Sequence, residues 1–154
     1  MRRQTKQSKV YHNTVLLLRS YRDLKEHISG SESLIKIEDQ ALEDWCEMNN
    51  VATSFEDYLK ATKKTKTTTV AMMKLVERYL KLYKEDAIKR QDENKLRRWQ
   101  VINLKYLQEN LTLEEIADKL EVNVSTVKKS HCRAIDELGV YFFGIEGLKL
   151  ERIE

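Results

Sequence analysis

The apolar positions of this 154-residue chain recur at helical intervals along most of its length. Residues three or four positions apart share one side of an α-helix, so this spacing predicts amphipathic helices. It predicts one helix over residues 8–28 and a second, acidic helix over residues 33–48. A short third helix is expected over residues 54–59, where Ser54 and Asp57 resemble a capping box. The first part of the chain is therefore expected to be helical.

The widest apolar surface is predicted for a helix over residues 70–90. Two adjacent stripes of apolar side chains run along it, Met73, Val76, Leu80, Tyr83 and Ala87 in one and Met72, Leu75, Tyr79 and Leu82 in the other. One stripe is enough for a helix to dock on a small domain. A helix with two stripes is either buried between two parts of the monomer or shared with a second chain. Both alternatives stay open, so a homodimer through residues 70–90 is one expectation.

A segment without apolar periodicity precedes this helix. Its sequence, ATKKTKTTT, is rich in Thr and Lys and nearly devoid of large apolar side chains, which is typical of a flexible linker. The chain is therefore expected to divide into an N-terminal helical region at residues 1–62 and a linker at residues 63–69. A connecting or oligomerisation helix takes residues 70–94, and the last unit takes residues 95–154.

The last unit is expected to contain several helical segments. The residues KLRRWQVINLKYLQ place three apolar side chains on one side of a helix, Trp99, Ile102 and Tyr106. Thr112, followed three residues later by Glu115, is a capping box that starts the next helix at Leu113. The residues LEVN then form a tight turn, in which Val122 fills the core and Asn123 caps the following helix.

Charges are sorted along the helix that follows this turn. On a helical wheel, four apolar residues lie on one side, Val127, Ala134, Ile135 and Leu138. Small hydroxyls and cations lie on the opposite side, Ser125, Thr126, Lys128, Lys129 and Arg133. A merely solvated face mixes acids with bases, whereas this one collects hydroxyls and cations at its N-terminal end, where a helix can enter the major groove and meet phosphates. The pair of helices therefore predicts a helix-turn-helix whose second helix contacts DNA.

The composition excludes several classes of protein. The chain has no proline and only four glycines, which favours an all-α fold. Its two cysteines are far apart, so neither a disulfide nor a zinc site is expected. No apolar run approaches the roughly 20 residues needed to cross a bilayer, so a cytoplasmic protein without membrane contact is expected. Since no phosphate loop or nucleophile motif is present, neither an enzyme nor a bound cofactor or metal is expected.

The segment RRWQVINLKYLQENLTLEEIADKLEVNVSTVKKSHCRAIDEL resembles the fourth conserved region of bacterial sigma factors, the helix-turn-helix that recognises promoters. The resemblance rests on the LTLEEIA core, the valine at position 127 and the RAIDEL ending. It implies base contacts by four residues, Val124, Ser125, Lys128 and Lys129. It implies contacts with the DNA backbone by four others, Thr112, Leu113, Thr126 and Arg133.

Three features depart from the sigma pattern. Val124 and Ser125 replace an Arg-Glu pair typical of primary sigma factors, so a different DNA target is expected. Ser130 occupies a position where an apolar core residue is common. Glu121 takes the place of the glycine often found in the turn, a change that is tolerated if this residue need not adopt a positive φ.

Over the whole chain, the segments LLLRSYRDLKEHI and AIDELGVYFFGI and the linker are similar to the ArpU/RinA group of phage and prophage transcriptional regulators. This likeness implies a sequence-specific, sigma-like activator of late phage genes that binds double-stranded DNA, and it leaves RNA polymerase open as a further partner. A second class, the small terminase subunit of a DNA-packaging machine, also joins a helix-turn-helix to an oligomerising helix. Ring-shaped oligomers would favour packaging, whereas a monomer or dimer with one promoter target would favour regulation.

The end of the chain carries three smaller expectations. Gly139 is expected to stop the last helix, and the apolar residues after it are expected to fold back over the helix-turn-helix core. His131 is expected to pack or to lie near DNA. Cys132 is expected to be an exposed thiol.

Overall fold

The computed structural model describes residues 3–29 and 66–152, with the side chains of residues 9–29 and 69–144. The regular elements in these ranges are all helical: α1 (Arg3–His27), α4 (Lys66–Arg90), α5 (Glu93–Ile102), the π-helix η2 (Asn103–Leu107), α6 (Leu113–Leu120) and α7 (Val124–Arg152). The expected all-α fold is confirmed. The helices predicted over residues 33–48 and 54–59 lie outside the described residues. None of the helices in the described ranges is long and apolar enough to cross a bilayer.

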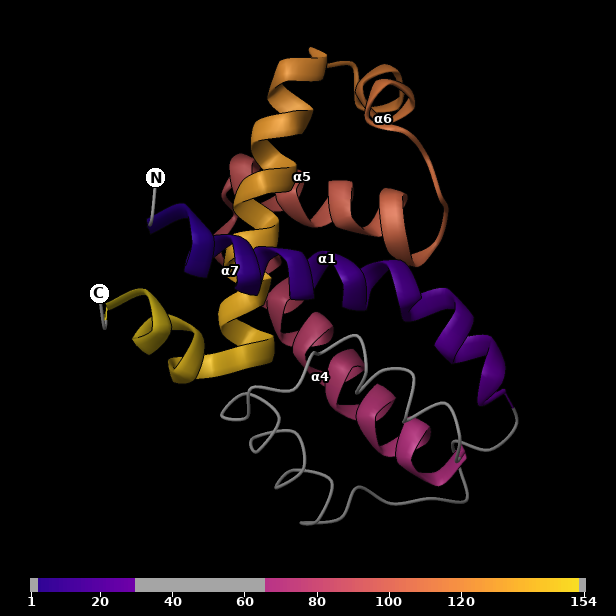
Figure 1. Ribbon diagram of the computed structural model, residues 1–154. Coiled ribbons are helices and arrows are strands. Elements are labelled where there is room, and N and C mark those ends of the chain that lie inside the picture. The colour runs from indigo at the N-terminus through magenta and orange to yellow at the C-terminus, as the bar shows by residue number, and fades with distance from the viewer. Residues whose placement is uncertain (1–2, 30–65, 153–154) are drawn as a thin grey trace.

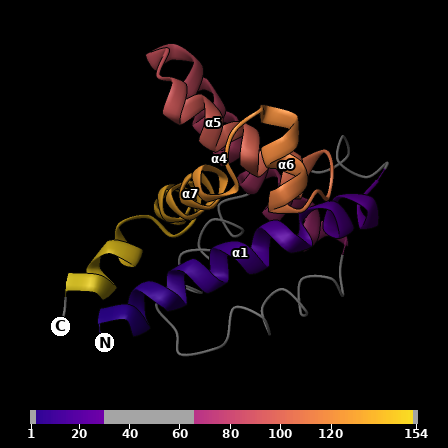
Figure 2. The same cartoon turned by 90° about the horizontal axis from the view of Figure 1, so that it is seen from above.

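The long helix α7 is the axis around which the other helices are arranged (Figure 1). Helix α1 packs across its middle, and α6 lies beside its N-terminal end. Seen from above, α7 stands nearly end-on with α1 on one side and α5 on the other (Figure 2). Helix α4 lies below and contacts α1, α5 and α7. The first helix of the chain is therefore part of the same packed body as the last.

Buried apolar side chains form two separate clusters. The larger cluster draws residues from α1, α4, the end of α5, η2 and the middle of α7. The smaller cluster joins the two helices of the predicted helix-turn-helix to α5 and η2, and consists of Val101, Leu104, Ile116, Ala117 and Val127. Ile102 and Tyr106 belong to the larger cluster and Val101 and Leu104 to the smaller one, so α5 and η2 form a wall between the two. Trp99 also packs against the larger cluster, which confirms its predicted side of the helix.

The end of α5 is a wider turn than an α-helix makes. The backbone N–H of Gln108 donates to the carbonyl of Asn103 at 2.9 Å, the five-residue spacing of a π-helix. The N–H of Leu111 then donates to the carbonyl of Leu104 at 3.2 Å, so the connection to α6 folds back on this segment. The wide turn places the ring of Tyr106 in the larger cluster, where it is 5% exposed.

Helix α4 begins earlier than the sequence indicated. Residues 66–69, which the Thr- and Lys-rich composition assigned to a linker, form its first turn, and the rest of that linker lies outside the described residues. Thr69 and Val70 are fully buried, and this burial outweighs the low helix propensity of consecutive threonines. Both apolar stripes of α4 are largely buried within the chain, since Met72 is 2% exposed, although Leu82 remains 44% exposed.

The prediction that Gly139 stops the last helix is wrong. Helix α7 continues past it and kinks only at Gly144, where φ is 57° and ψ is −150°. A Cβ atom on Gly139 would lie 3.0 Å from Cγ1 of Val10 and 3.1 Å from Oγ1 of Thr14. The glycine is therefore explained by the close crossing of α1 over α7 and not by a turn.

The apolar tail also packs differently from the expectation. Because α7 stays straight, Phe142 and Phe143 enter the larger cluster with α1 and α4 instead of folding over the helix-turn-helix core. The ring of Tyr79 on α4 meets that of Phe142 edge-on at a centroid distance of 6.2 Å. The side chains of the later tail residues lie outside the described ones.

Candidate nucleic-acid interface

Helix α6 starts with the capping box that the sequence predicted. The Glu115 N–H donates to Oγ1 of Thr112 at 3.1 Å, and the Thr112 N–H donates to Oε1 of Glu115 at 3.0 Å. The bond from the Thr112 backbone N–H, which favours the ionised form, holds the pKa of the Glu115 carboxyl below its usual value. The helix therefore begins at Leu113, with Thr112 exposed and Leu113 partly buried at the point where backbone contacts with DNA were predicted.

The turn after α6 closes around a residue in the left-handed conformation. Glu121 has φ 58° and ψ 44°. The sequence allowed glutamate here only if φ were not positive, so this residue is held in a conformation that is strained for any residue except glycine. The Val122 N–H donates to the carbonyl of Ala117 at 3.0 Å, and the Glu121 N–H donates to that of Asp118 at 3.3 Å. This is the Schellman pattern, which normally takes glycine at its left-handed position. Holding glutamate there costs about 1–2 kcal/mol.

The turn brings the two helices together over a small residue. Ala117 is 3% exposed and lies in the smaller cluster with Val127 of α7, while Val122 packs against that cluster as predicted. The carbonyl of Asn123 accepts from the N–H groups of Thr126 and Val127 at 3.0 and 3.2 Å, which starts α7. A larger side chain in place of Ala117 would push the two helices apart.

The N-terminal part of α7 separates its polar and apolar sides as the wheel predicted. Four apolar residues have no exposed surface, Val127, Ala134, Ile135 and Leu138. The four most polar ones are exposed, Ser125, Lys128, Lys129 and Arg133, while Val124 and Thr126 are partly buried. Ser130, at a position where an apolar residue is common, is 8% exposed. Which of these side chains touches a base and which touches a phosphate remains a prediction.

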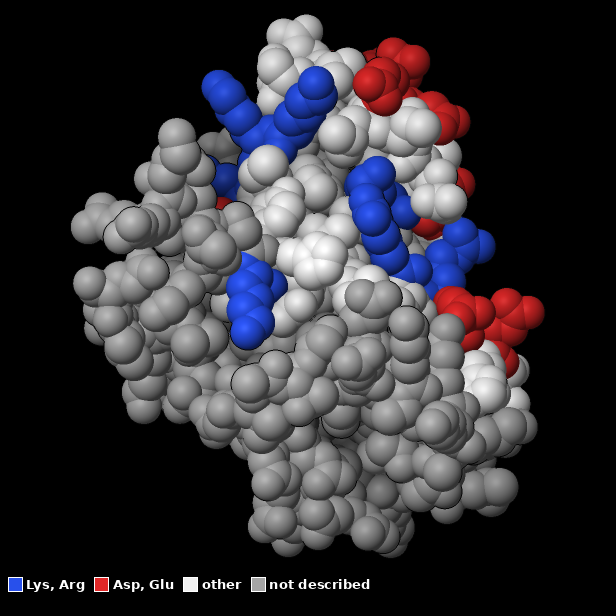
Figure 3. Space-filling model, viewed as in Figure 1, with Lys and Arg blue, Asp and Glu red and all other residues white. Residues whose placement is uncertain are grey.

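The charges of the two helices lie on different parts of the surface. Figure 3 shows lysine and arginine side chains around the upper end of α7 and acidic side chains over the neighbouring α6. Among the ion pairs within the described residues, none involves Lys128, Lys129 or Arg133. These cations are therefore available to an anionic partner. Further along α7, Glu137 accepts hydrogen bonds from Tyr83 at 2.7 Å and from Arg98 at 3.1 Å, and so joins α7 to α4 and α5.

His131 joins α7 to η2. Its Nε2 lies 2.6 Å from the hydroxyl oxygen of Tyr106, and the two rings are 5.7 Å apart. Burial lowers the pKa of His131 to about 4, with further lowering by the positive charges of Lys105 and Arg19. Burial raises the pKa of Tyr106 to about 12. His131 is therefore neutral at pH 7, and its Nε2 accepts the hydrogen bond from the Tyr106 hydroxyl in the tautomer that carries the ring proton on Nδ1.

Helix α1 reaches α7 at Cys132. The thiol is exposed, as expected, and the hydroxyl of Tyr11 donates to its Sγ at 3.6 Å. Burial, with a smaller contribution from Cys132, raises the pKa of Tyr11 above its usual value. No local pattern indicated this contact, because the two residues lie on opposite sides of the linker and only the packed fold brings them together.

Comparison with known families identifies the segment that carries this geometry. Residues 96–138 match the family described as sigma-70, region 4. These residues form a region 4 helix-turn-helix domain. The match runs from α5 through η2 and α6 into α7 and ends at Leu138, so α1 and α4 lie outside it. Neither the curated proteins nor the solved structures include a significant match to the chain.

The region 4 domain agrees with the observed charge pattern, because domains of this family bind DNA. No three His, Cys, Asp or Glu side chains in the described part of the chain converge in a way that could hold a metal ion. The chemistry of the site is thus that of a protein surface that binds a polyanion: exposed ammonium, guanidinium and hydroxyl groups on a rigid helix.

Proposed function

We propose that this chain is a sequence-specific DNA-binding transcriptional regulator that reads duplex DNA with the N-terminal part of α7. The observation that carries the proposal is the exposed Ser125, Lys128, Lys129 and Arg133 on α7, within a region 4 domain. These cations form no ion pair within the described residues, and the opposite, apolar side of α7 is buried. A helix with these groups at its free end can lie in the major groove, where side chains reach base edges and flanking phosphates.

Each side chain has a proposed role. Base edges are contacted by Val124, Ser125, Lys128 and Lys129. The sugar–phosphate backbone is contacted by Thr112, Leu113, Thr126 and Arg133. The N-terminus of α6 suits backbone contact because its dipole and the N–H groups that the capping box leaves unbonded, those of Leu113 and Glu114, favour an anion. Lysine near the start of α7 suits a guanine edge, which offers two acceptors.

The finer assignment is a sigma-like activator of late genes in a phage or prophage, with RNA polymerase as a second partner. It is supported by the resemblance of the segments LLLRSYRDLKEHI and AIDELGVYFFGI and of the linker to the ArpU/RinA group. The competing assignment is a small terminase subunit. The exposed large apolar side chains of α4 are Leu82 and Ile88, at 44% and 53%, and they are the candidates for a homodimer contact. Sedimentation of the full chain separates the two assignments, because rings support packaging and monomers or dimers support regulation.

We further propose that residues 95–154 carry the DNA contacts and that the N-terminal helices complete their core. Ile135, Leu138 and Phe142 lie in the cluster that α1 and α4 help to form. A fragment restricted to residues 95–154 would expose these side chains to water, so full-length protein is the right material for binding experiments.

The experiment first selects bound sequences from a random pool of duplexes and then titrates variants on the selected and scrambled sites. Lys128→Ala or Lys129→Ala should change the preferred sequence at one position, at a cost of about 1–3 kcal/mol. Arg133→Ala should weaken all sequences alike and make the dependence of log K on log salt shallower by roughly one unit. Lys81→Ala is a matched control, because Lys81 lies on α4, its side chain is 76% exposed, and among the described residues it pairs only with Glu85. Unchanged DNA binding by the triple variant of Lys128, Lys129 and Arg133 would overturn the proposal.

A further inference from the structure

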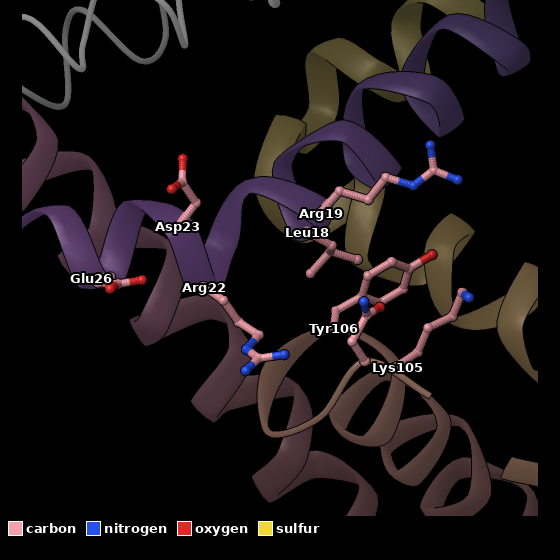
Figure 4. Close-up of a pocket in the computed structure, with 8 residues that line it drawn as sticks. Leu18, Arg19, Arg22, Asp23, Glu26, Lys105 and Tyr106 are labelled. Carbon is pink, nitrogen blue, oxygen red and sulfur yellow. The ribbon is translucent and has the colours of Figure 1, made fainter. Parts of the chain in front are cut away.

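A groove with a cavity volume of about 630 Å³ lies between α1 and η2, beside the recognition helix. Its lining residues are Leu18, Arg19, Arg22, Asp23, Glu26, Lys105, Tyr106 and Asn110. Figure 4 shows the side chains of Arg19, Lys105 and Tyr106 gathered at one end, with Arg22 between them and the carboxylates of Asp23 and Glu26. The polar lining is unsuited to an apolar ligand, and one end of the groove is positively charged.

The three cations of this groove lack anionic partners within the described residues. Arg19, Arg22 and Lys105 take part in none of the ion pairs there, and Lys105 lies 5.6 Å from the centre of the Tyr106 ring. Cations that hold the fold together behave differently. Lys95 pairs with Asp86 at 2.9 Å, and Arg98 pairs with Glu137 at 3.1 Å. Three cations that face one groove without such partners favour an external anion.

The groove is connected to the recognition helix. Tyr106, which lines it, bonds to His131 at 2.6 Å, and His131 follows Lys128 by one helical turn. Arg19 and Lys105 are close enough to His131 to lower its pKa. In Figure 3, blue side chains lie both at the upper end of α7 and over the region of α1 and η2 on the same face of the molecule. A single rod-shaped polyanion could therefore contact both groups.

We propose that Arg19, Arg22 and Lys105 form a second phosphate-binding surface, which holds the sugar–phosphate backbone of duplex DNA next to the site read by α7. The proposal rests on the proposed function, since it requires that α7 binds DNA. Guanidinium groups present a planar fork that matches the oxygens of a phosphodiester. Arg19 and Arg22 belong to α1, outside the matched region 4 segment, so α1 gives this chain a backbone contact that residues 96–138 lack.

The test uses the full chain and two duplexes that contain the same selected site, one ending at the site and one extended by about one helical turn on each side. The double variant Arg19→Gln/Lys105→Gln should bind the extended duplex roughly tenfold more weakly near physiological salt. Its dependence of log K on log salt should be shallower by about one unit for each phosphate that the variant no longer binds. The short duplex should be bound as by the wild type, and the sequence preference should be unchanged. Arg19→Lys, which keeps the charge, should recover most of the affinity.

Two controls separate the outcomes. Lys81→Gln removes a charge on α4 and should leave both duplexes bound as before, and thermal melting checks that each variant is folded. If Lys128→Ala changes the sequence preference while the groove variant binds as the wild type at every salt concentration, the groove proposal is wrong and the proposed function stands. An equal loss of affinity on both duplexes also overturns it, because the cations would then act within the site. If the wild-type chain binds neither duplex, both proposals are wrong. Inorganic phosphate at about 10 mM, added at constant ionic strength, is too dilute to screen duplex binding appreciably. If it nevertheless competes with the extended duplex for the groove, the occupant is free phosphate and the duplex assignment is wrong.

Discussion

Lowering the pH is expected to weaken the fold through His131. In the folded chain the pKa of this imidazole is about 4, because the ring is largely buried and lies near Lys105 and Arg19. In the unfolded chain the ring returns to its ordinary value of about 6.5. Between these two values the unfolded chain binds a proton that the folded chain does not. The free energy of unfolding therefore falls as the pH falls from about 6.5 to about 4, and His131 has no effect on it above that window.

The size of the effect follows from the same shift. One pKa unit corresponds to about 1.4 kcal/mol, so the change from 6.5 to about 4 sets an upper limit of about 3.4 kcal/mol. Part of the ring reaches solvent, and screening there reduces the expected loss to about 1–2 kcal/mol. Protonation would also leave the imidazolium able only to donate to the Tyr106 oxygen, so Tyr106 could no longer donate to this ring.

The measurement is urea denaturation of the wild type and of His131→Gln at several pH values between 7 and 4. Carboxylates titrate in the same range in both proteins, so the informative quantity is the difference between the two stability curves. Stability of the wild type relative to the variant should decline by about 1–2 kcal/mol as the pH falls. His12→Gln, at an exposed position of α1, is the matched control and should follow the wild type. Parallel curves for the wild type and His131→Gln would refute the account of a buried neutral histidine.

Two further predictions concern positions where the backbone is constrained. Glu121→Gly should stabilise the protein by about 1 kcal/mol, because glycine adopts the observed φ of 58° without strain, whereas Glu121→Ala should bring no such gain in denaturant titrations. Gly139→Ala should destabilise it by about 1–3 kcal/mol, since the new methyl would meet Val10 at 3.0 Å. Val10→Ala should recover part of that loss, and additive effects in a double-mutant cycle would contradict the close crossing of α1 and α7.

The helix-turn-helix could be predicted from the sequence because its determinants are local. The capping box at Thr112 and Glu115 and the one-sided apolar face of α7 depend only on residues a few positions apart, and both are observed. The conformation of Glu121 was not predictable in this way, because a glutamate gives no sign of a left-handed backbone. The packing of the two helices sets the backbone of Glu121 in that conformation, and the Schellman hydrogen bonds hold it there.

The contacts of α1 could not be predicted because they join residues far apart along the chain. Gly139 was interpreted from local propensity as a helix stop, but its role depends on Val10 and Thr14, which cross it in space. The groove could not be predicted for the same reason, because its cations Arg19 and Lys105 belong to separate helices that only the fold brings together. Residues 66–69 were interpreted as part of a linker because the segment is rich in Thr and Lys and nearly devoid of large apolar side chains, and the burial of Thr69 in the fold was not visible in the composition.

The continuous helix α7 has a consequence for regulation. Its first turns carry the proposed DNA contacts, and its later turns, as far as Phe143, pack against α1 and α4. The helix between these two parts is continuous up to Gly144. A stiff rod of this kind transmits a tilt at one end to the other, so a molecule bound on the α1 and α4 side would alter the position of the DNA-contacting end. If such an effector raised the affinity for DNA by some factor, DNA would raise the affinity for the effector by the same factor. The N-terminal helices are therefore suited to act as an input to the DNA-binding end, in addition to stabilising it.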